Sequence, residues 1–194
     1  MFLDEPPHSE GAQRMFDDDQ KYMGWVMNVS RLWAWQPASQ EALFDLLGAV
    51  SDGFSMRERG VLVAACASTF GDSYCSMAWG GKLAKESDTE TAVGVLTGSD
   101  EGLTPSEKAM ARWARAVVED PNAVTQADID DLRAAGFSDA DVFAMTVFVA
   151  LRLAFSTVND ALGSRPDPEL RSFSPPEVIA AVGFGRPIGD DAPH

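Results

Sequence analysis

The residues best suited to chemistry lie in the segment Gly71-Asp72-Ser73-Tyr74-Cys75. Gly71 is a typical helix stop, and Asp72 or Ser73 can cap a following helix, so this segment is expected to join two helices. Cys75 then lies in the first turn of the second helix, where free backbone N–H groups and the positive end of the helix dipole favour the thiolate. The position makes Cys75 the candidate nucleophile, able to attack a peroxide or an electrophilic carbon.

Three neighbours of this cysteine are further candidates for the site. Asp72 is the expected helix cap and also a candidate acid or base, although its carboxylate opposes a negative charge on the Cys75 thiol. Tyr74 and Trp79 flank Cys75 in the expected helix. They are candidates to line a substrate pocket, with packing in the core as the alternative.

Arg152 interrupts the most apolar segment of the chain. A buried cation needs a partner, so we expect this arginine to form an ion pair within the protein or to bind the carboxylate of a substrate. The candidate protein partners are Asp160, Glu58 and Asp72.

The cysteine and histidine content limits the other kinds of chemistry. The two cysteines, Cys66 and Cys75, are too few for a disulfide scaffold, and the sequence around Cys66 favours a packed core thiol. The two histidines, His8 and His194, lie near opposite ends of the sequence. No metal site and no cofactor are therefore expected, and Cys-His or Ser-His catalysis would need a terminus to fold back.

The hydrophobic pattern predicts an all-α fold. Apolar residues recur at helical spacing over 22–33, 43–50 and 55–70, and strand-like alternation is missing. Capping pairs mark three later helix starts, which are Thr104 with Glu107, Thr125 with Asp128, and Ser138 with Asp141. The helix from Ser138 to about Leu162 is apolar nearly all round, so we expect it at the centre of a bundle or in an oligomer interface.

The chain divides into three parts by composition. Residues 1–19 form an acidic N-terminal arm, residues 20–163 a single all-α domain, and residues 164–194 a proline-rich C-terminal tail with at most one short helix. The 194 residues are enough to bury a sizeable core.

The charge balance excludes one class of partner. Lysine and arginine total 15 against 30 aspartates and glutamates, which gives a net charge of -15. Nucleic acid is not expected to bind, because phosphate recognition needs clustered cations. No apolar stretch is expected to span a membrane, and the first residues do not resemble a signal peptide, so a cytoplasmic location is expected.

Two stretches resemble the alkyl hydroperoxidase D-like family, also called the carboxymuconolactone decarboxylase family. The family pattern has an Arg-rich helix start, a glutamate, Cys-x-x-Cys and a histidine. Cys75 matches the second cysteine, whereas Gly60, Asp72 and Trp79 stand where the glutamate, the first cysteine and the histidine are expected. Residues 103–170, with EDPNAVTQADIDDLRAAGFSDAD and VNDALG, resemble the peroxidase-related branch of the family.

The resemblance implies a helical bundle that assembles as a homotrimer or hexamer. It also implies that the second cysteine attacks the substrate, while the disulfide cycle within the motif is impossible here. A single-thiol peroxidase-like enzyme follows, in which Cys75 reacts with peroxide and an external thiol or Cys66 reduces it. The alternatives are a cofactor-free decarboxylase, lactone-processing or isomerising enzyme for a small metabolite, and a non-catalytic protein kept for binding or assembly.

Overall fold

The computed structural model describes residues 1–189, which form eleven α-helices and no β-strand. The predicted all-α class is therefore confirmed for this part of the chain. The helices are α1 (Glu10–Tyr22), α2 (Asn28–Trp33), α3 (Pro37–Val50), α4 (Met56–Phe70), α5 (Ser73–Glu86), α6 (Thr89–Thr97), α7 (Pro105–Glu119), α8 (Gln126–Ala134), α9 (Asp139–Ala161), α10 (Leu170–Phe173) and α11 (Pro176–Ala181).

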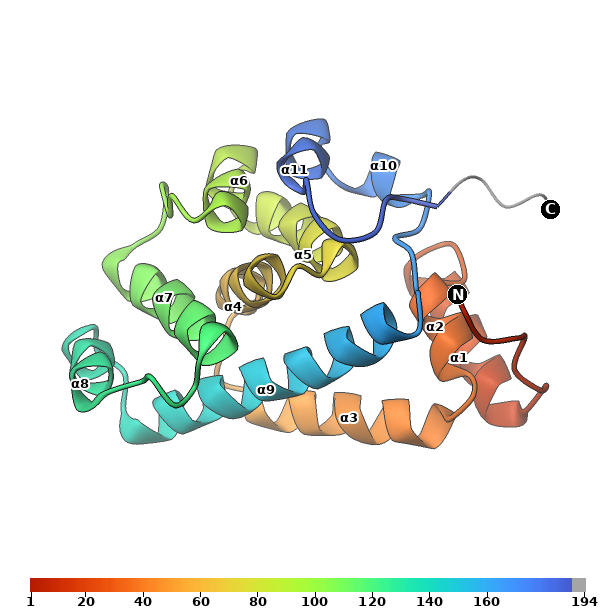
Figure 1. The fold of residues 1–194 in the computed structure, drawn as a ribbon, viewed down its shortest axis with the longest axis horizontal. Coiled ribbons are helices and arrows are strands. Elements are labelled where there is room, and N and C mark those ends of the chain that lie inside the picture. The colour runs from red at the N-terminus through yellow and green to blue at the C-terminus, as the bar shows by residue number, and fades with distance from the viewer. Residues whose placement is uncertain (190–194) are drawn as a thin grey trace.

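Helix α4 occupies the centre of the bundle. It packs against α5, α6, α7 and α9, which surround it in Figure 1. Residues 60–67 of α4 are all buried, because a run of alanine, valine and glycine lets neighbouring helices approach from every side. The prediction that the long helix α9 lies at the centre was wrong: α4 is central, whereas α9 runs between α4 and α3 in Figure 1, and Phe143 on it is 70% exposed.

The predicted helix starts are present. Capping boxes open α7 at Thr104, α8 at Thr125 and α9 at Ser138, each with the acidic residue three positions later. Each box satisfies backbone N–H groups that a helix start leaves without partners. These signals are local in sequence, which is why they could be read without the structure.

The helix predicted over 22–33 was wrong in its bounds. Helix α1 ends at Tyr22, and Gly24 has a φ of 88°, a left-handed conformation that takes the chain out of the helix. The apolar residues after it belong to a turn and to the short helix α2. The spacing resembled one helix because both pieces direct apolar side chains to the same core.

The ends of the chain are more ordered than their composition suggested. The region expected as an acidic arm, residues 1–19, contains most of α1, in which Ser9 accepts a hydrogen bond from the Ala12 backbone N–H at 3.1 Å. The tail holds two short helices, α10 and α11, rather than at most one. Leu170 and Val178 anchor them in the core. The final residues of the predicted tail, 190–194, lie outside the described residues.

Helix α9 has the length and apolar composition of a membrane span, contrary to the expectation that no stretch would. In this structure it is a bundle helix, since one side packs against α3, α4 and α7 and the buried cation Arg152 lies on it.

Candidate functional site

The turn between α4 and α5 positions the cysteine as the sequence predicted. Gly71 ends α4 with a φ of 88°, and Asp72 caps α5 by accepting a hydrogen bond from the Cys75 backbone N–H at 2.9 Å. Only a residue without a side chain adopts this left-handed conformation at no steric cost, so the glycine fixes the tight turn. Cys75 therefore lies in the first turn of α5, as expected.

The Cys75 thiol is buried beside a cation. The residue is 3% exposed, and its Sγ lies 3.3 Å from Nη2 of Arg152 on α9. Burial raises the pKa of the Cys75 thiol well above its usual value, and the Asp72 carboxylate raises it further. The Arg152 charge and the Ser156 hydroxyl act in the opposite direction. In the closed site the cysteine is consequently a protonated thiol.

A buried hydrogen bond links the carboxylate to the long helix. The Ser156 hydroxyl donates to Oδ2 of Asp72 at 2.6 Å, and the same oxygen of Ser156 lies 3.9 Å from Sγ of Cys75. Asp72 is 0% and Ser156 2% exposed, so bulk water does not reach either group. Ser156 therefore connects the thiol to the carboxylate, and the three groups can pass a proton along one short path.

Arg152 forms no ion pair among the described residues, contrary to the sequence-based expectation. Its guanidinium carbon instead lies 5.3 Å from the centre of the Trp79 ring and 5.2 Å from that of Phe155. Two aromatic faces and a sulfur compensate part of the cost of burying the cation. Its Nε atom, also buried, has no hydrogen-bond partner within residues 1–189. The cation is thus available to a new negative charge on the thiol.

Comparison with solved structures identifies the fold. The chain matches an uncharacterized peroxidase-related protein from Ralstonia eutropha JMP134 with an alkylhydroperoxidase AhpD core, with a TM-score of 0.73 and 23% identity over 87% of this chain and 93% of that one. A peroxidase-related protein from Silicibacter sp. TM1040 gives a TM-score of 0.77 and 21% identity over the same shares. This chain has the alkylhydroperoxidase D-like fold.

The same fold supports a different reaction in a third match. The debrominase Bmp8 aligns with a TM-score of 0.73 and 14% identity over 94% of this chain and 98% of that one. A cysteine-to-alanine variant of Bmp8 has been crystallised with 2,3,4-tribromopyrrole, and it matches with a TM-score of 0.69. No protein-family profile matches the sequence, and no curated protein is significantly similar to it.

Gly60 lies where α4 and α5 cross closely. A Cβ atom added at this glycine would lie 3.2 Å from Cβ and 3.5 Å from Cα of Leu83 on α5. A glutamate, which the family resemblance implies at this position, would therefore push α4 and α5 apart. The polar groups beside Cys75 are instead those of Asp72 and Ser156.

The two aromatic candidates have different surroundings. The Tyr74 hydroxyl bonds to Asp167, whose carboxylate also accepts a hydrogen bond from the Asn28 backbone N–H at 2.8 Å. Tyr74 thus ties α5 to the C-terminal segment. Trp79 is half-buried and covers Arg152 on one side, while Nζ of Lys82 lies 4.5 Å from the centre of its ring. Of the two candidates, Trp79 is therefore the one whose ring contacts Arg152, as the Phe155 ring also does.

Cys66 is a second free thiol, and it is buried like Cys75. It is 1% exposed, and burial raises its pKa to about 12, partly offset by the charge of Arg152. Unlike Cys75, it makes no side-chain hydrogen bond to Arg152 or Ser156 within residues 1–189. The structure shows both cysteines as free thiols.

Ser156 is the one member of the site that the sequence analysis did not identify. It follows Arg152 by four residues, so the two side chains lie on the same face of α9. A serine one turn after a buried arginine was the available signal. The sequence alone could not show that α9 crosses the start of α5, and it is this crossing that brings Ser156 to Asp72.

A segment near the C-terminus contacts the helix ends beside this site. We call residues 182–189 the strap. The Ser73 hydroxyl donates to the Arg186 carbonyl oxygen at 2.7 Å, and Nη2 of Arg186 donates to the Asp160 carbonyl oxygen at 2.9 Å. The Gly189 backbone N–H bonds to Pro166 at 2.9 Å. The strap thus crosses the start of α5 and the end of α9, the two ends that hold Asp72 and Ser156.

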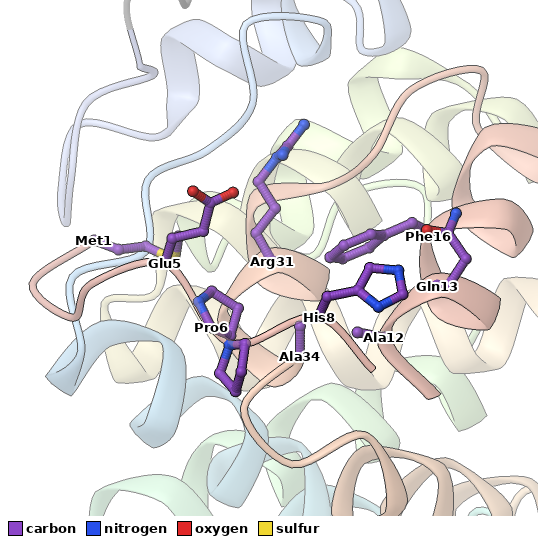
Figure 2. A pocket seen from close by; sticks show the side chains of 10 residues that line it. Met1, Glu5, Pro6, His8, Ala12, Gln13, Phe16, Arg31 and Ala34 are labelled. Carbon is purple, nitrogen blue, oxygen red and sulfur yellow. The ribbon is translucent and has the colours of Figure 1, made fainter. Parts of the chain in front are cut away.

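The histidine that the structure describes is not part of the site. His8 lines a separate cavity formed with α1 and α2 (Figure 2), and His194 lies outside the described residues. Within residues 1–189 no group of three or more His, Cys, Asp or Glu side chains is arranged to hold a metal ion. The polar side chains that bond to Cys75 are those of Asp72, Arg152 and Ser156.

Proposed function

We propose that this alkylhydroperoxidase D-like protein is a thiol-dependent peroxidase-like enzyme in which Cys75 is the single reacting thiol. The observation that carries the proposal is the 3.3 Å contact between Cys75 Sγ and the otherwise unpaired Arg152, beside the Asp72–Ser156 hydrogen bond. The arginine would hold the thiolate, and the serine and aspartate would receive its proton.

The charge balance of the site supports this division of roles. When the Cys75 proton passes through Ser156 to Asp72, the carboxylate becomes neutral as the thiol becomes negative. The buried site then contains one negative charge beside Arg152 both before and after the transfer. The transfer therefore avoids the large free energy of placing an additional unpaired charge in a low-dielectric interior.

The reaction with a peroxide balances with these groups. The thiolate attacks one peroxide oxygen, the O–O bond breaks, and the leaving alkoxide or hydroxide takes the proton from Asp72 through Ser156. Cys75 becomes a sulfenic acid. An external small thiol then forms a mixed disulfide with loss of water, and a second thiol restores Cys75. The motif offers no resolving cysteine, because Asp72 stands in that position.

Mass spectrometry of the whole protein tests the proposal. Reduced protein is treated with limiting hydrogen peroxide, and intact mass and peptide mapping locate the added oxygen. We expect selective oxidation of Cys75, unchanged in Cys66→Ser and lost in Cys75→Ser. A Cys75 that stays reduced while exposed methionines oxidise would reject the peroxidase-like reaction.

A second candidate function follows from the similarity to Bmp8. The same thiolate could attack a small electrophilic ring, in a cofactor-free reaction on a small aromatic metabolite, rather than a peroxide. Incubation with 2,3,4-tribromopyrrole and an external thiol, with bromide release as the readout, separates this function from the first. Bromide release that depends on Cys75, without peroxide consumption, would favour it.

A further inference from the structure

A cavity of about 340 Å³ lies between the N-terminal segment and helices α1 and α2 (Figure 2). Its size falls in the range of small-molecule sites in proteins. It does not include Cys75 or any residue of the thiol site. A ligand bound here would therefore be distinct from the substrate of that site.

Small residues at the floor leave this cavity open. Ala12 of α1 and Ala34 at the end of α2 are 3% and 2% exposed, and both line it. In Figure 2, Pro6 stands on one side, and the rings of His8 and Phe16 stand on the other. The walls are mainly apolar, which suits a flat apolar body between the proline and the two rings.

Two charges of opposite sign stand at the rim. Glu5 and Arg31 line the cavity, and Figure 2 shows the carboxylate and the guanidinium extending toward the same side of it. They form no salt bridge with each other or with another residue within residues 1–189, although the Arg31 charge also acts on the Asp19 carboxylate. A molecule that carries both an amine and a carboxylate would pair with both.

We propose that this cavity binds a small zwitterion with an apolar body, of the class of aromatic α-amino acids. The ammonium group pairs with Glu5, the carboxylate with Arg31, and the side chain enters the space above Ala12 and Ala34. A simple anion is a poorer ligand, because the protein carries a net charge of -15 and Glu5 would face it. A simple cation is poorer because Arg31 would face it.

Isothermal titration of the full chain with three probes tests the proposal. The probes are L-phenylalanine, 3-phenylpropanoate and 2-phenylethylamine, which share one ring and differ in charge. We expect L-phenylalanine to bind at least about tenfold more tightly than either singly charged probe, equivalent to about 1.4 kcal/mol. Equal binding of a singly charged probe, or no binding of any probe, would overturn the proposal.

Variants assign the binding to this cavity. Arg31→Gln should remove the preference for L-phenylalanine over 2-phenylethylamine, and Ala34→Leu should fill the space and abolish binding. Arg14→Gln is the matched control, because Arg14 is an exposed arginine on α1 outside this cavity. Circular dichroism confirms that each variant is folded. Binding that Ala34→Leu and Arg31→Gln leave unchanged would place the ligand elsewhere and overturn the assignment.

Discussion

The Cys75 thiol and the Asp72 carboxylate share one buried site, and Arg152 is the cation in contact with the sulfur. Two negative charges there would share one cation in contact with the sulfur, Arg152, while the Lys82 charge also acts on the site from beside the Trp79 ring. A single proton shared through Ser156 removes this conflict, because either the sulfur or the carboxylate is then neutral. The chemistry of the site thus depends on the serine that joins the two groups.

Replacement of the linking serine tests this argument. Ser156→Ala should slow the oxidation of Cys75 by peroxide about 100-fold, in the range of lost proton-transfer catalysis. It should also cost about 1–3 kcal/mol of stability, because the buried Asp72 loses a hydrogen bond. Stopped-flow oxidation and chemical denaturation measure the two effects. Ser172→Ala, at an exposed position of α10, should change neither. Equal oxidation rates in Ser156→Ala and wild type would exclude the relay.

We expect Arg152 to increase the reactivity of the Cys75 thiol and to lower the stability of the folded protein. The buried cation lacks an ion-pair partner among the described residues, and buried charges replaced by apolar side chains of similar volume often leave a protein equally or more stable. We expect Arg152→Met to keep or raise the midpoint of thermal unfolding while it slows Cys75 oxidation at least about tenfold. A variant that unfolds early but retains its thiol reactivity would show that the arginine is structural.

Asp160 makes stability depend on pH. Burial and the neighbouring Asp72 raise its pKa from 3.8 to about 6. The folded state then binds this proton more tightly than the unfolded state does. The contribution of Asp160 to the free energy of unfolding is therefore fully present below pH 3.8 and is lost as the pH rises to about 6. Asp160→Asn should add about 1 kcal/mol at neutral pH, after allowance for its half-exposed side chain.

The comparison of denaturation curves at two pH values checks this prediction. The gain from Asp160→Asn should be present at neutral pH and absent near pH 3.5, where the wild-type carboxyl is protonated. The exposed Asp131→Asn on α8 serves as the control. A gain of the same size at both pH values would mean that the amide makes new contacts rather than relieving a buried charge.

Among the elements, the strap of residues 182–189 packs against the turn that opens α5. One of its glycines, Gly185, has a φ of 69° and lies against this turn: an added Cβ atom would be 2.6 Å from the Gly71 carbonyl oxygen and 2.9 Å from the Ser73 backbone nitrogen. Only glycine fits such a close approach. We therefore expect this contact to limit access to the buried Cys75 thiol.

A single methyl group should open the strap. Gly185→Ala should increase the rate at which iodoacetamide modifies Cys75 at least about tenfold, because the clash lifts the strap from the start of α5 and raises the population of the open state. Gly183→Ala is the matched control, since a Cβ atom there meets no other atom within 4 Å. Peptide mapping separates Cys75 from Cys66. Identical labelling rates in the two variants would show that access to Cys75 takes another route.

The limits of sequence analysis are clearest among these elements. The caps at Asp72, Thr104 and Ser138 could be predicted because each depends on residues within one turn. The separation of α5 from α6 was not predicted, although Asp88 caps α6 through the Thr91 backbone N–H at 2.7 Å. The strap and Ser156 could not be predicted, because their contacts join residues about 80 to 110 positions apart in the chain.

At the scale of the whole molecule, helix α9 keeps one face without a partner in the single chain. The exposed or half-exposed positions on this face are spaced alternately by four and three residues, and they are Phe143, Val147, Ala150, Ala154, Thr157 and Ala161. Such spacing is the pattern of a helix that packs along another helix. No charged residue belongs to this set, in a protein that is rich in charge elsewhere.

We expect this face to join copies of the chain in a homo-oligomer, and a charge placed in it should dissociate the assembly. Ala154→Arg would bury a cation without a partner in each interface, at a cost of several kcal/mol. Sedimentation velocity should show a trimer or hexamer for the wild type and a smaller species for the variant. Ala134→Arg, at an exposed alanine of α8, should leave the assembly intact. Because α9 also carries Arg152 and Ser156, the same two variants test whether assembly affects the reaction of Cys75. If Cys75 oxidation is slower in Ala154→Arg than in Ala134→Arg, the neighbouring copy holds the site in its reactive arrangement. Equal oxidation rates in the two variants would mean that each chain reacts independently.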